Sequence, residues 1–327
     1  MNNLTKLFLF FLVAVTMVSF VITPSLLYVL DASSENISEL QDKSQQLGNA
    51  EALNPENLQQ IVAEGAKKIK SQITKSDYLF IYCSQIAYNF LCFLISALLF
   101  RKLVFSKQSI KKDWSKTNIS LYFLTPFLLL SALPIIGESL HLNKMLGIDW
   151  LIEQSGYNLN EGSVGNMIFS YAVFVPETKF QLFTSIVFVA IIPAIGEELF
   201  FRGSLQKTLT PHLGNIHNTI FVTAFIFSAL HFEITAFFYR FFLGVILGYI
   251  FYWTKNLMIP ILIHALNNGM TVFTMYYTFS ATEVIDTSSQ AGNDKAFALI
   301  YSTLAASSIL WVYYLYFKKQ NLESTSQ

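Results

Sequence analysis

Charged side chains are scarce in this 327-residue chain, in which Asp, Glu, Lys and Arg together make up 13% of the residues. A soluble globular domain usually carries about 25% charged residues. Hydrophobic residues account for 53% of the chain, so the composition excludes a water-soluble domain and indicates an integral membrane protein. The formal net charge is zero, which argues against a nucleic-acid partner and leaves membrane lipid as the first expected partner.

Cysteine is also scarce, and two common protease motifs are missing. Cys83 and Cys92 lie in one apolar segment, which excludes a disulfide framework and a cysteine-based metal site. The chain contains no H-E-x-x-H, the usual zinc-protease pattern. It also contains no G-x-S-x-G, the pattern that presents a nucleophilic serine. Any hydrolytic chemistry must therefore use other residues.

What the chain does have is a series of long apolar stretches, which predict an all-α polytopic membrane bundle of about eight transmembrane helices. The first stretch is longer than the roughly 7–15 apolar residues of a secretory signal, so we predict an uncleaved span. The predicted spans are 7–30, 78–100, 119–136, 181–201, 219–238, 241–253, 257–279 and 296–317.

The polar segments between these spans divide the chain. Apolar residues at helical spacing within 55–75 predict an amphipathic helix outside the bilayer, whereas 141–179 is predicted to be a loop and 203–218 a connector. The resulting divisions are a first span (1–30), a polar region (31–77), the second and third spans (78–141), a loop (142–180), a core that carries the motifs described below (181–280), and a last span with a polar tail (281–327).

Basic residues collect on one side of the predicted bundle. Eight spans place both termini on the same side as the segment after the second span and as Lys207, Lys255 and Lys318. That segment carries six basic residues, Arg101, Lys102, Lys107, Lys111, Lys112 and Lys116. Because cytoplasmic loops are enriched in Lys and Arg, we expect both termini to be cytoplasmic, 31–77 and 141–179 to lie outside, and the protein to reside in the plasma membrane.

The sequence Ile195-Gly-Glu-Glu-Leu-Phe-Phe-Arg-Gly203 stands at the predicted end of the fourth span. Adjacent positions on a helix point about 100° apart, so Glu197 and Glu198 cannot share one environment. Arg202 follows Glu198 by four residues, on the same face and in the favourable acid-then-base order. The spacing therefore predicts an ion pair between Glu198 and Arg202 and leaves Glu197 for chemistry.

Polar residues also occur inside two later spans. His231 follows Phe227 by one helical turn, and Asn268 follows His264 by one turn, so each pair shares a helix face. Ionisable groups at membrane depth are candidates for function. His231 lies roughly 18 Å from the predicted start of its span, deeper than the other polar groups. This depth requires either a later helix start or a cavity that reaches into the bilayer.

Taken in order, Glu-Glu-x-x-x-Arg (197–202), Phe-x-x-x-His (227–231) and His-x-x-x-Asn (264–268) resemble the three motifs of the CAAX protease and bacteriocin-processing family. This family of intramembrane endopeptidases includes the type II CAAX prenyl endopeptidases. The stretch from Phe241 to Tyr252 also resembles the segment between the family's second and third motifs. The resemblance covers about 181–278, less than a third of the chain, and implies an endopeptidase acting on membrane-associated peptides or proteins.

The resemblance implies a catalytic set of Glu197, Glu198, Arg202, His231, His264 and Asn268. A carboxylate in a cavity poor in water suits a general base, which favours Glu197 for that role. The resemblance assigns His231 a share in holding or activating the attacking water. His264 and Asn268 can donate hydrogen bonds to the oxyanion, and Glu198 with Arg202 would support the other groups.

The cofactor requirement stays open at this point. Two histidines and one carboxylate form a known catalytic zinc set, which here would be Glu197, His231 and His264. The resemblance implies a glutamate-dependent reaction without metal at least as readily. Two other classes of function also remain: a membrane module that binds peptides without cleaving them, as in bacteriocin immunity, and a proton-coupled transporter. The sequence lacks the paired repeats that transporters usually show.

Overall fold

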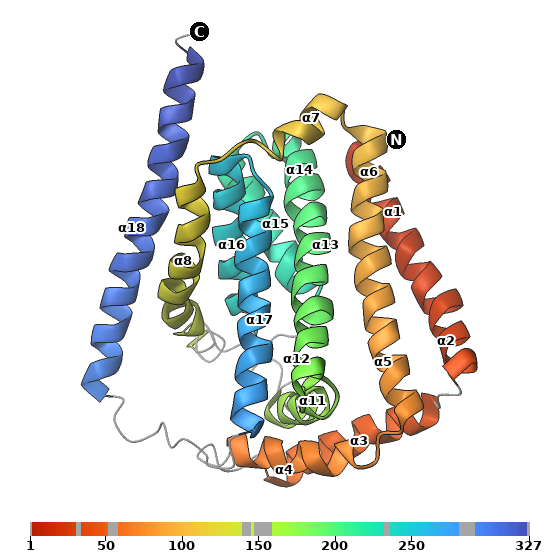
Figure 1. Ribbon diagram of the computed structural model, residues 1–327. Coiled ribbons are helices and arrows are strands. Elements are labelled where there is room, and N and C mark those ends of the chain that lie inside the picture. The colour runs from red at the N-terminus through yellow and green to blue at the C-terminus, as the bar shows by residue number, and fades with distance from the viewer. Residues whose placement is uncertain are drawn as a thin grey trace.

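The computed structural model describes residues 2–30, 34–51, 58–138, 145–146, 159–231, 236–280 and 292–325. Within these residues the chain is helical and has no β-strand, which confirms the predicted all-α membrane bundle (Figure 1). Seven helical segments in this part of the chain are long and apolar enough to cross a membrane: Asn3–Leu30, Lys75–Val104, Ile119–Glu138, Lys179–Leu213, Phe237–Thr254, Met258–Tyr277 and Leu299–Leu322.

Three of these segments contain π-helical stretches, labelled η, and the rest are single α-helices. In chain order, the first of the seven segments consists of α1 (Asn3–Met17), η1 (Val18–Ile22) and α2 (Thr23–Leu30). The second consists of α5 (Lys75–Tyr88), η3 (Asn89–Ile95) and α6 (Ser96–Val104), and the third is α8 (Ile119–Glu138). The fourth segment is one continuous helix made of α12 (Lys179–Ser185), η5 (Ile186–Ile191), α13 (Ile192–Phe200), η6 (Phe201–Gln206) and α14 (Lys207–Leu213). The last three segments lie in α16 (Phe237–Thr254), α17 (Met258–Ser280) and α18 (Gly292–Thr325).

The fifth predicted span differs from the structure in length. Its helix, α15 (Ile216–Ala229), has 14 residues and is therefore only about 21 Å long. The hydrocarbon core of a bilayer is about 30 Å thick. The chain thus turns back into α16 within the bundle, and the prediction of a span over 219–238 is wrong in its end point.

The fourth predicted span is longer than expected. The helix continues past Phe201 to Leu213, so the predicted connector 203–218 is mostly helical. Gly203 does not end the helix, and its missing side chain instead lets the guanidinium of Arg101 approach and donate to the Gly203 carbonyl. The helix ends where Gly214 adopts a left-handed conformation with φ +65°.

One end of the bundle is covered by a layer of three helices, α3 (Ser34–Glu51), α4 (Leu58–Lys70) and α11 (Leu159–Phe174) (Figure 1). The amphipathic helix predicted within 55–75 is confirmed by α4, whereas α11 shows that the predicted loop 141–179 is partly helical. The layer has its own apolar core, which consists of Leu40, Val62, Ala66, Ile69, Ile168 and Ala172. We call α3, α4 and α11 the end layer.

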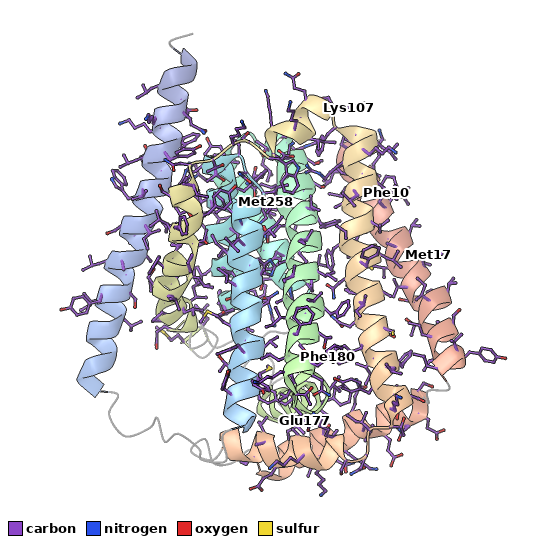
Figure 2. All side chains as sticks on the ribbon, viewed as in Figure 1. Phe10, Met17, Lys107, Glu177, Phe180 and Met258 are labelled. Atoms are coloured by element: carbon purple, nitrogen blue, oxygen red, sulfur yellow. The ribbon has the colours of Figure 1, made fainter. Side chains whose placement is uncertain are left out.

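The opposite end holds the start of α1, the end of α18 and the short helix α7 (Lys107–Lys112) (Figure 1). Lys107 lies at this end and Glu177 beside the end layer (Figure 2). Asp113 accepts hydrogen bonds here from Arg101 Nη2 at 2.7 Å and from Lys207 Nζ at 2.9 Å. Both termini and the basic segments therefore lie at the same end of the bundle, as predicted.

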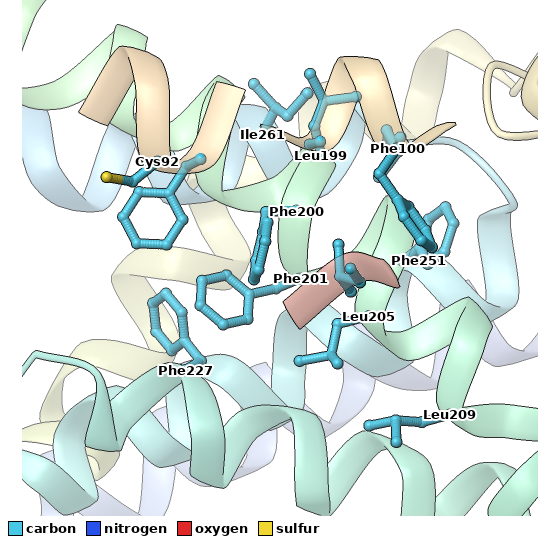
Figure 3. Packing of buried hydrophobic residues seen from close by; sticks show 14 of the residues in the cluster. Cys92, Phe100, Leu199, Phe200, Phe201, Leu205, Leu209, Phe227, Phe251 and Ile261 are labelled. Atoms are coloured by element: carbon cyan, nitrogen blue, oxygen red, sulfur yellow. The ribbon is translucent and has the colours of Figure 1, made fainter. Parts of the chain in front are cut away.

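The main apolar core surrounds the junction of α13 and η6. The rings of Phe200, Phe201 and Phe227 gather there (Figure 3), with centroids 5.1 Å apart in each successive pair. On the neighbouring side, α15 and α16 approach closely because Gly244 has no side chain: a β-carbon there would lie 3.0 Å from Cβ of Ala224. This close approach is what the Gly244–Gly248 spacing in the sequence suggests.

Candidate active site

The predicted ion pair between Glu198 and Arg202 lies in the centre of the bundle. Arg202 Nη1 donates to Glu198 Oε1 at 2.6 Å, and both side chains are fully buried. Arg202 Nη2 donates to the carbonyl of Gly244 on α16 at 2.9 Å. The guanidinium also lies 5.0 Å from the ring centroid of Phe227 on α15. Arg202 is therefore held by groups from three different helical segments.

His264 on α17 joins the same carboxylate. Its Nδ1 lies 2.8 Å from Glu198 Oε1, and its Nε2 lies 3.8 Å from Glu197 Oε2. An ionised carboxylate can only accept, so Nδ1 carries the hydrogen and Nε2 of the neutral ring is an acceptor. Glu198 therefore orients both Arg202 and the ring of His264, with Nε2 turned toward Glu197.

Glu197 differs from Glu198 in its surroundings, as the helix geometry predicts. Its side chain lines a cavity of about 670 Å³. Among the residues that the structure describes, no donor bonds its buried Oε2 atom. The carboxylate thus has one oxygen oriented toward His264 and access to the cavity, as a group that receives a proton from a bound molecule requires.

The cavity brings together four of the six predicted residues, Glu197, His231, His264 and Asn268. From Glu197 it extends along α13 and η5 to Phe188 and along α17 to Met275, and it reaches Ser170 on α11. From Glu197, the cavity therefore extends away from α7 and toward the end layer. The cavity is therefore a pocket in the bundle with Glu197 near one end, and the buried Glu198 and Arg202 lie behind its wall.

His231 stands just after α15, where the chain turns toward α16. Its Nδ1 lies 2.8 Å from the carbonyl oxygen of Phe227, one helical turn earlier. A carbonyl accepts, so this contact places the hydrogen on Nδ1 and makes Nε2 the acceptor in the neutral ring. The ring of Phe227 packs edge-on at 5.0 Å between centroids and separates His231 from the core.

The depth of His231 now has an explanation. Glu197 and His231 both lie 17 residues, or roughly five helical turns, from Gly214, where α14 turns into α15. The two residues are at similar depth because the fourth helix continues to Leu213. Glu197 is consequently in the middle of a long helix, and the expectation that it lies at the foot of its span is wrong. A later start of the fifth helix is also wrong, because α15 begins at Ile216.

Three cavity residues were missed by the sequence reasoning. Tyr239 donates its hydroxyl to Asn267 Oδ1 at 2.7 Å, and Asn267 Nδ2 lies 3.4 Å from Asn268 Oδ1. Because these contacts use the side-chain oxygen of Asn268, Oδ1, its side-chain nitrogen, Nδ2, is the atom that can donate to a bound molecule. Arg240 also lines the cavity. Tyr239 and Arg240 fall between the predicted spans 219–238 and 241–253, so the search for polar residues inside spans did not include them.

A metal site is not formed by the arrangement of the described side chains. Within the described ranges, no three His, Cys, Asp or Glu residues are grouped so that they could hold a metal ion. The possible zinc set of Glu197, His231 and His264 lines one cavity but is not gathered around a point. The described side chains, in this arrangement, therefore do not form a metal-binding site.

Residues 179–270 match the family model described as type II CAAX prenyl endopeptidase Rce1-like. The matched segment begins at α12 and ends in α17, so it contains all three motifs. It covers less than a third of the chain and leaves the first three spans and the end layer outside. No curated protein and no solved structure matches the chain. This part of the chain is therefore similar to an intramembrane protease family, as the motifs indicate.

Removal of the Glu198 charge should destabilise the fold. Glu198→Gln should lower the free energy of unfolding by about 3–5 kcal/mol because Arg202 would then be an uncompensated buried charge. Arg202→Ala should have a similar effect, and the double substitution should be less than additive because both changes break one pair. Denaturant unfolding in detergent measures the three variants.

The matched control for these variants is Glu177→Gln. Glu177 forms an ion pair with Lys70 at 3.0 Å, and its side chain is 64% exposed. Loss of such a pair should change stability by about 1 kcal/mol or less. If Glu198→Gln were as stable as Glu177→Gln, the central role of the Glu198 carboxylate would be refuted.

Proposed function

We propose that the protein is an intramembrane endopeptidase that hydrolyses peptide bonds in membrane-associated peptides or proteins. The observation that carries the proposal is the position of Glu197 in the cavity, beside His264 and on the helix that carries the first family motif. A peptide-binding module needs a pocket but no proton acceptor at its inner end. Polar groups from three helical regions that line one cavity are typical of a catalytic site.

Glu197 is the general base in this proposal. It takes a proton from a water molecule while the water oxygen bonds to the carbonyl carbon of the substrate. The electrons of the carbonyl double bond move to the oxygen and form a tetrahedral oxyanion. Glu197 then gives its proton to the leaving nitrogen as the C–N bond breaks, which releases a carboxylic acid and an amine and restores the carboxylate.

The histidines and Asn268 have separate parts in this reaction. His231, with its hydrogen on Nδ1, presents Nε2 as an acceptor that can orient the attacking water. Asn268 can donate its amide hydrogens to the oxyanion. His264 can add a second donor only when both of its ring nitrogens carry a hydrogen, because the hydrogen on Nδ1 already bonds to Glu198.

The orientation that we propose has the α7 end in the cytoplasm, because that end carries most of the basic segments. The end layer then lies outside. Since the cavity extends from Glu197 toward the end layer, the proposed substrate reaches the site from the outer half of the membrane or from its outer surface. This arrangement favours exported or membrane-inserted peptides over cytoplasmic proteins.

The base assignment predicts that Glu197→Gln removes nearly all turnover without loss of stability. The expected reduction is about 10²- to 10⁴-fold, the usual effect of removing a general base. Because the substrate is not yet identified, the measurement compares peptides in membranes from cells with wild-type protein, Glu197→Gln, or Glu35→Gln, which changes an exposed carboxylate on α3.

Peptide products should be present with wild type and Glu35→Gln and absent with Glu197→Gln. Identical peptides in all three samples would contradict the proposal that the protein is a protease. If Glu197→Gln kept activity and Glu198→Gln lost it with no loss of stability, the two glutamates would exchange roles.

Activity of the purified protein should survive strong chelation. No step of the proposed reaction needs a metal, so cleavage of an identified product sequence should continue in EDTA or phenanthroline. Metal analysis of the same sample should find no stoichiometric zinc. Loss of activity in chelator with recovery on addition of zinc alone would contradict the metal-free reaction and support the zinc set.

The orientation can be tested with single cysteines in a Cys83→Ala, Cys92→Ala background. Ser38 on α3 and Gln108 on α7 are exposed at opposite ends of the bundle. A membrane-impermeant maleimide should label Ser38→Cys in intact cells and Gln108→Cys only after permeabilisation. The reverse pattern would place the end layer in the cytoplasm.

A further inference from the structure

Arg240 presents a permanent positive charge to the cavity. The residues of α16 and its N-cap that line the cavity are Ala236, Tyr239, Arg240 and Leu243, which form one helix face. Arg240 lies one turn, about 6 Å, before Gly244, whose carbonyl binds Arg202. Arg240 therefore lies on the helical turn next to the backbone group that binds the central ion pair, inside the bundle, where an ionisable group is expensive and marks a functional position.

The cavity has two oppositely charged positions. Among the described residues that line it, only Glu197 and Arg240 carry a full charge, apart from histidines that can be protonated. Glu198 and Arg202 bind each other behind the wall and do not line the cavity. Much of the remaining lining is apolar or aromatic, including Phe93, Phe174 and Phe188. Such walls limit water, so each charge acts strongly on a bound molecule.

We propose that Arg240 binds a carboxylate of the substrate and thereby sets which peptide bond reaches Glu197. This inference rests on the proposed endopeptidase function. A guanidinium binds a carboxylate through two parallel hydrogen bonds, which fixes the direction of the bound group. Glu197 repels the same carboxylate. The substrate is thus held with its anionic group at α16 and an uncharged peptide bond at the base.

Arg240 also interacts with other groups in the chain. A guanidinium has five N–H donors, so it can keep an internal partner and still bind a carboxylate. The carboxylate can belong to the C-terminus of the substrate or to an Asp or Glu side chain. Both sources offer Arg240 the same chemistry, and the peptides in the test distinguish them.

The test uses three pools of fluorophore-labelled peptides with randomised uncharged positions. The first pool ends in a free carboxylate, the second ends in an amide, and the third ends in an amide but contains one Asp or Glu. Full-length protein in proteoliposomes should cleave the first or the third pool about 10- to 100-fold faster than the second, the usual effect of a charge-assisted hydrogen bond. The preferred pool identifies the source of the carboxylate.

Arg240→Gln should abolish that preference by slowing cleavage of the carboxylate pool to the rate of the amide pool. Arg240→Lys should keep part of the preference because a point charge remains. The control is Lys179→Gln, which removes an exposed cation that does not line the cavity and should leave the preference intact. Equal slowing of all pools by Arg240→Gln would overturn the inference, because the residue would then act on chemistry or on the fold.

A binding measurement separates this inference from the proposed function. Fluorescence anisotropy records binding of the same pools to Glu197→Gln and to Glu197→Gln/Arg240→Gln. Preference for a carboxylate pool in the single variant and its loss in the double variant would support the role of Arg240 even if no cleavage occurred. Equal binding of all pools to Glu197→Gln would overturn that role, whether or not the wild type cleaves peptides.

Discussion

The structure depends on one buried carboxylate, that of Glu198. It accepts from Arg202, which also donates to α16, and from His264 on α17, so Glu198 and Arg202 together connect three helical segments. A buried charge is tolerated only when it is paired and hydrogen-bonded. The close approach of α15 and α16 at Gly244 keeps Phe227 and the Gly244 carbonyl within reach of Arg202. The packing around this centre places the neighbouring residue, Glu197, at the cavity.

The site is asymmetric because consecutive helix positions point in different directions. Glu198 faces the protein and is neutralised, whereas Glu197 faces the cavity next to His264. A single pair of adjacent glutamates thus supplies a structural anchor and the proposed general base from one turn of helix. The His264 ring lies beside both carboxylates, with Nδ1 2.8 Å from Glu198 and Nε2 3.8 Å from Glu197, so the anchor also orients the ring toward the cavity.

The short helix α15 explains how a cavity can exist at this depth. Its chain turns back before crossing a full bilayer thickness, and His231 lies at this turn beside the cavity. Backbone that leaves regular helical structure inside a membrane is tolerated only where protein or a polar cavity surrounds it. The end layer adds Ser170 and Phe174 to the far part of the cavity. The turn after α15 and the end layer thus both contribute residues to the cavity.

Much of the organisation follows from the sequence alone. The scarcity of charge and the long apolar runs determine an all-α membrane bundle, because a spanning chain must satisfy its backbone hydrogen bonds internally. The four-residue spacing of Glu198 and Arg202 determines their pairing, because that contact lies within one helix turn. The amphipathic helix near 58–70 follows from local periodicity for the same reason.

Only the tertiary structure decided the contacts between helices. The bond from His264 to Glu198, the position of Arg240 in the cavity and the helix within the predicted loop 141–179 were not predictable from spacing. Helix ends were also missed, because Gly203 resembles a helix terminator in sequence but serves as the point where Arg101 approaches the backbone. Such features depend on which side chains meet across elements distant in the chain, and local periodicity carries no information about that.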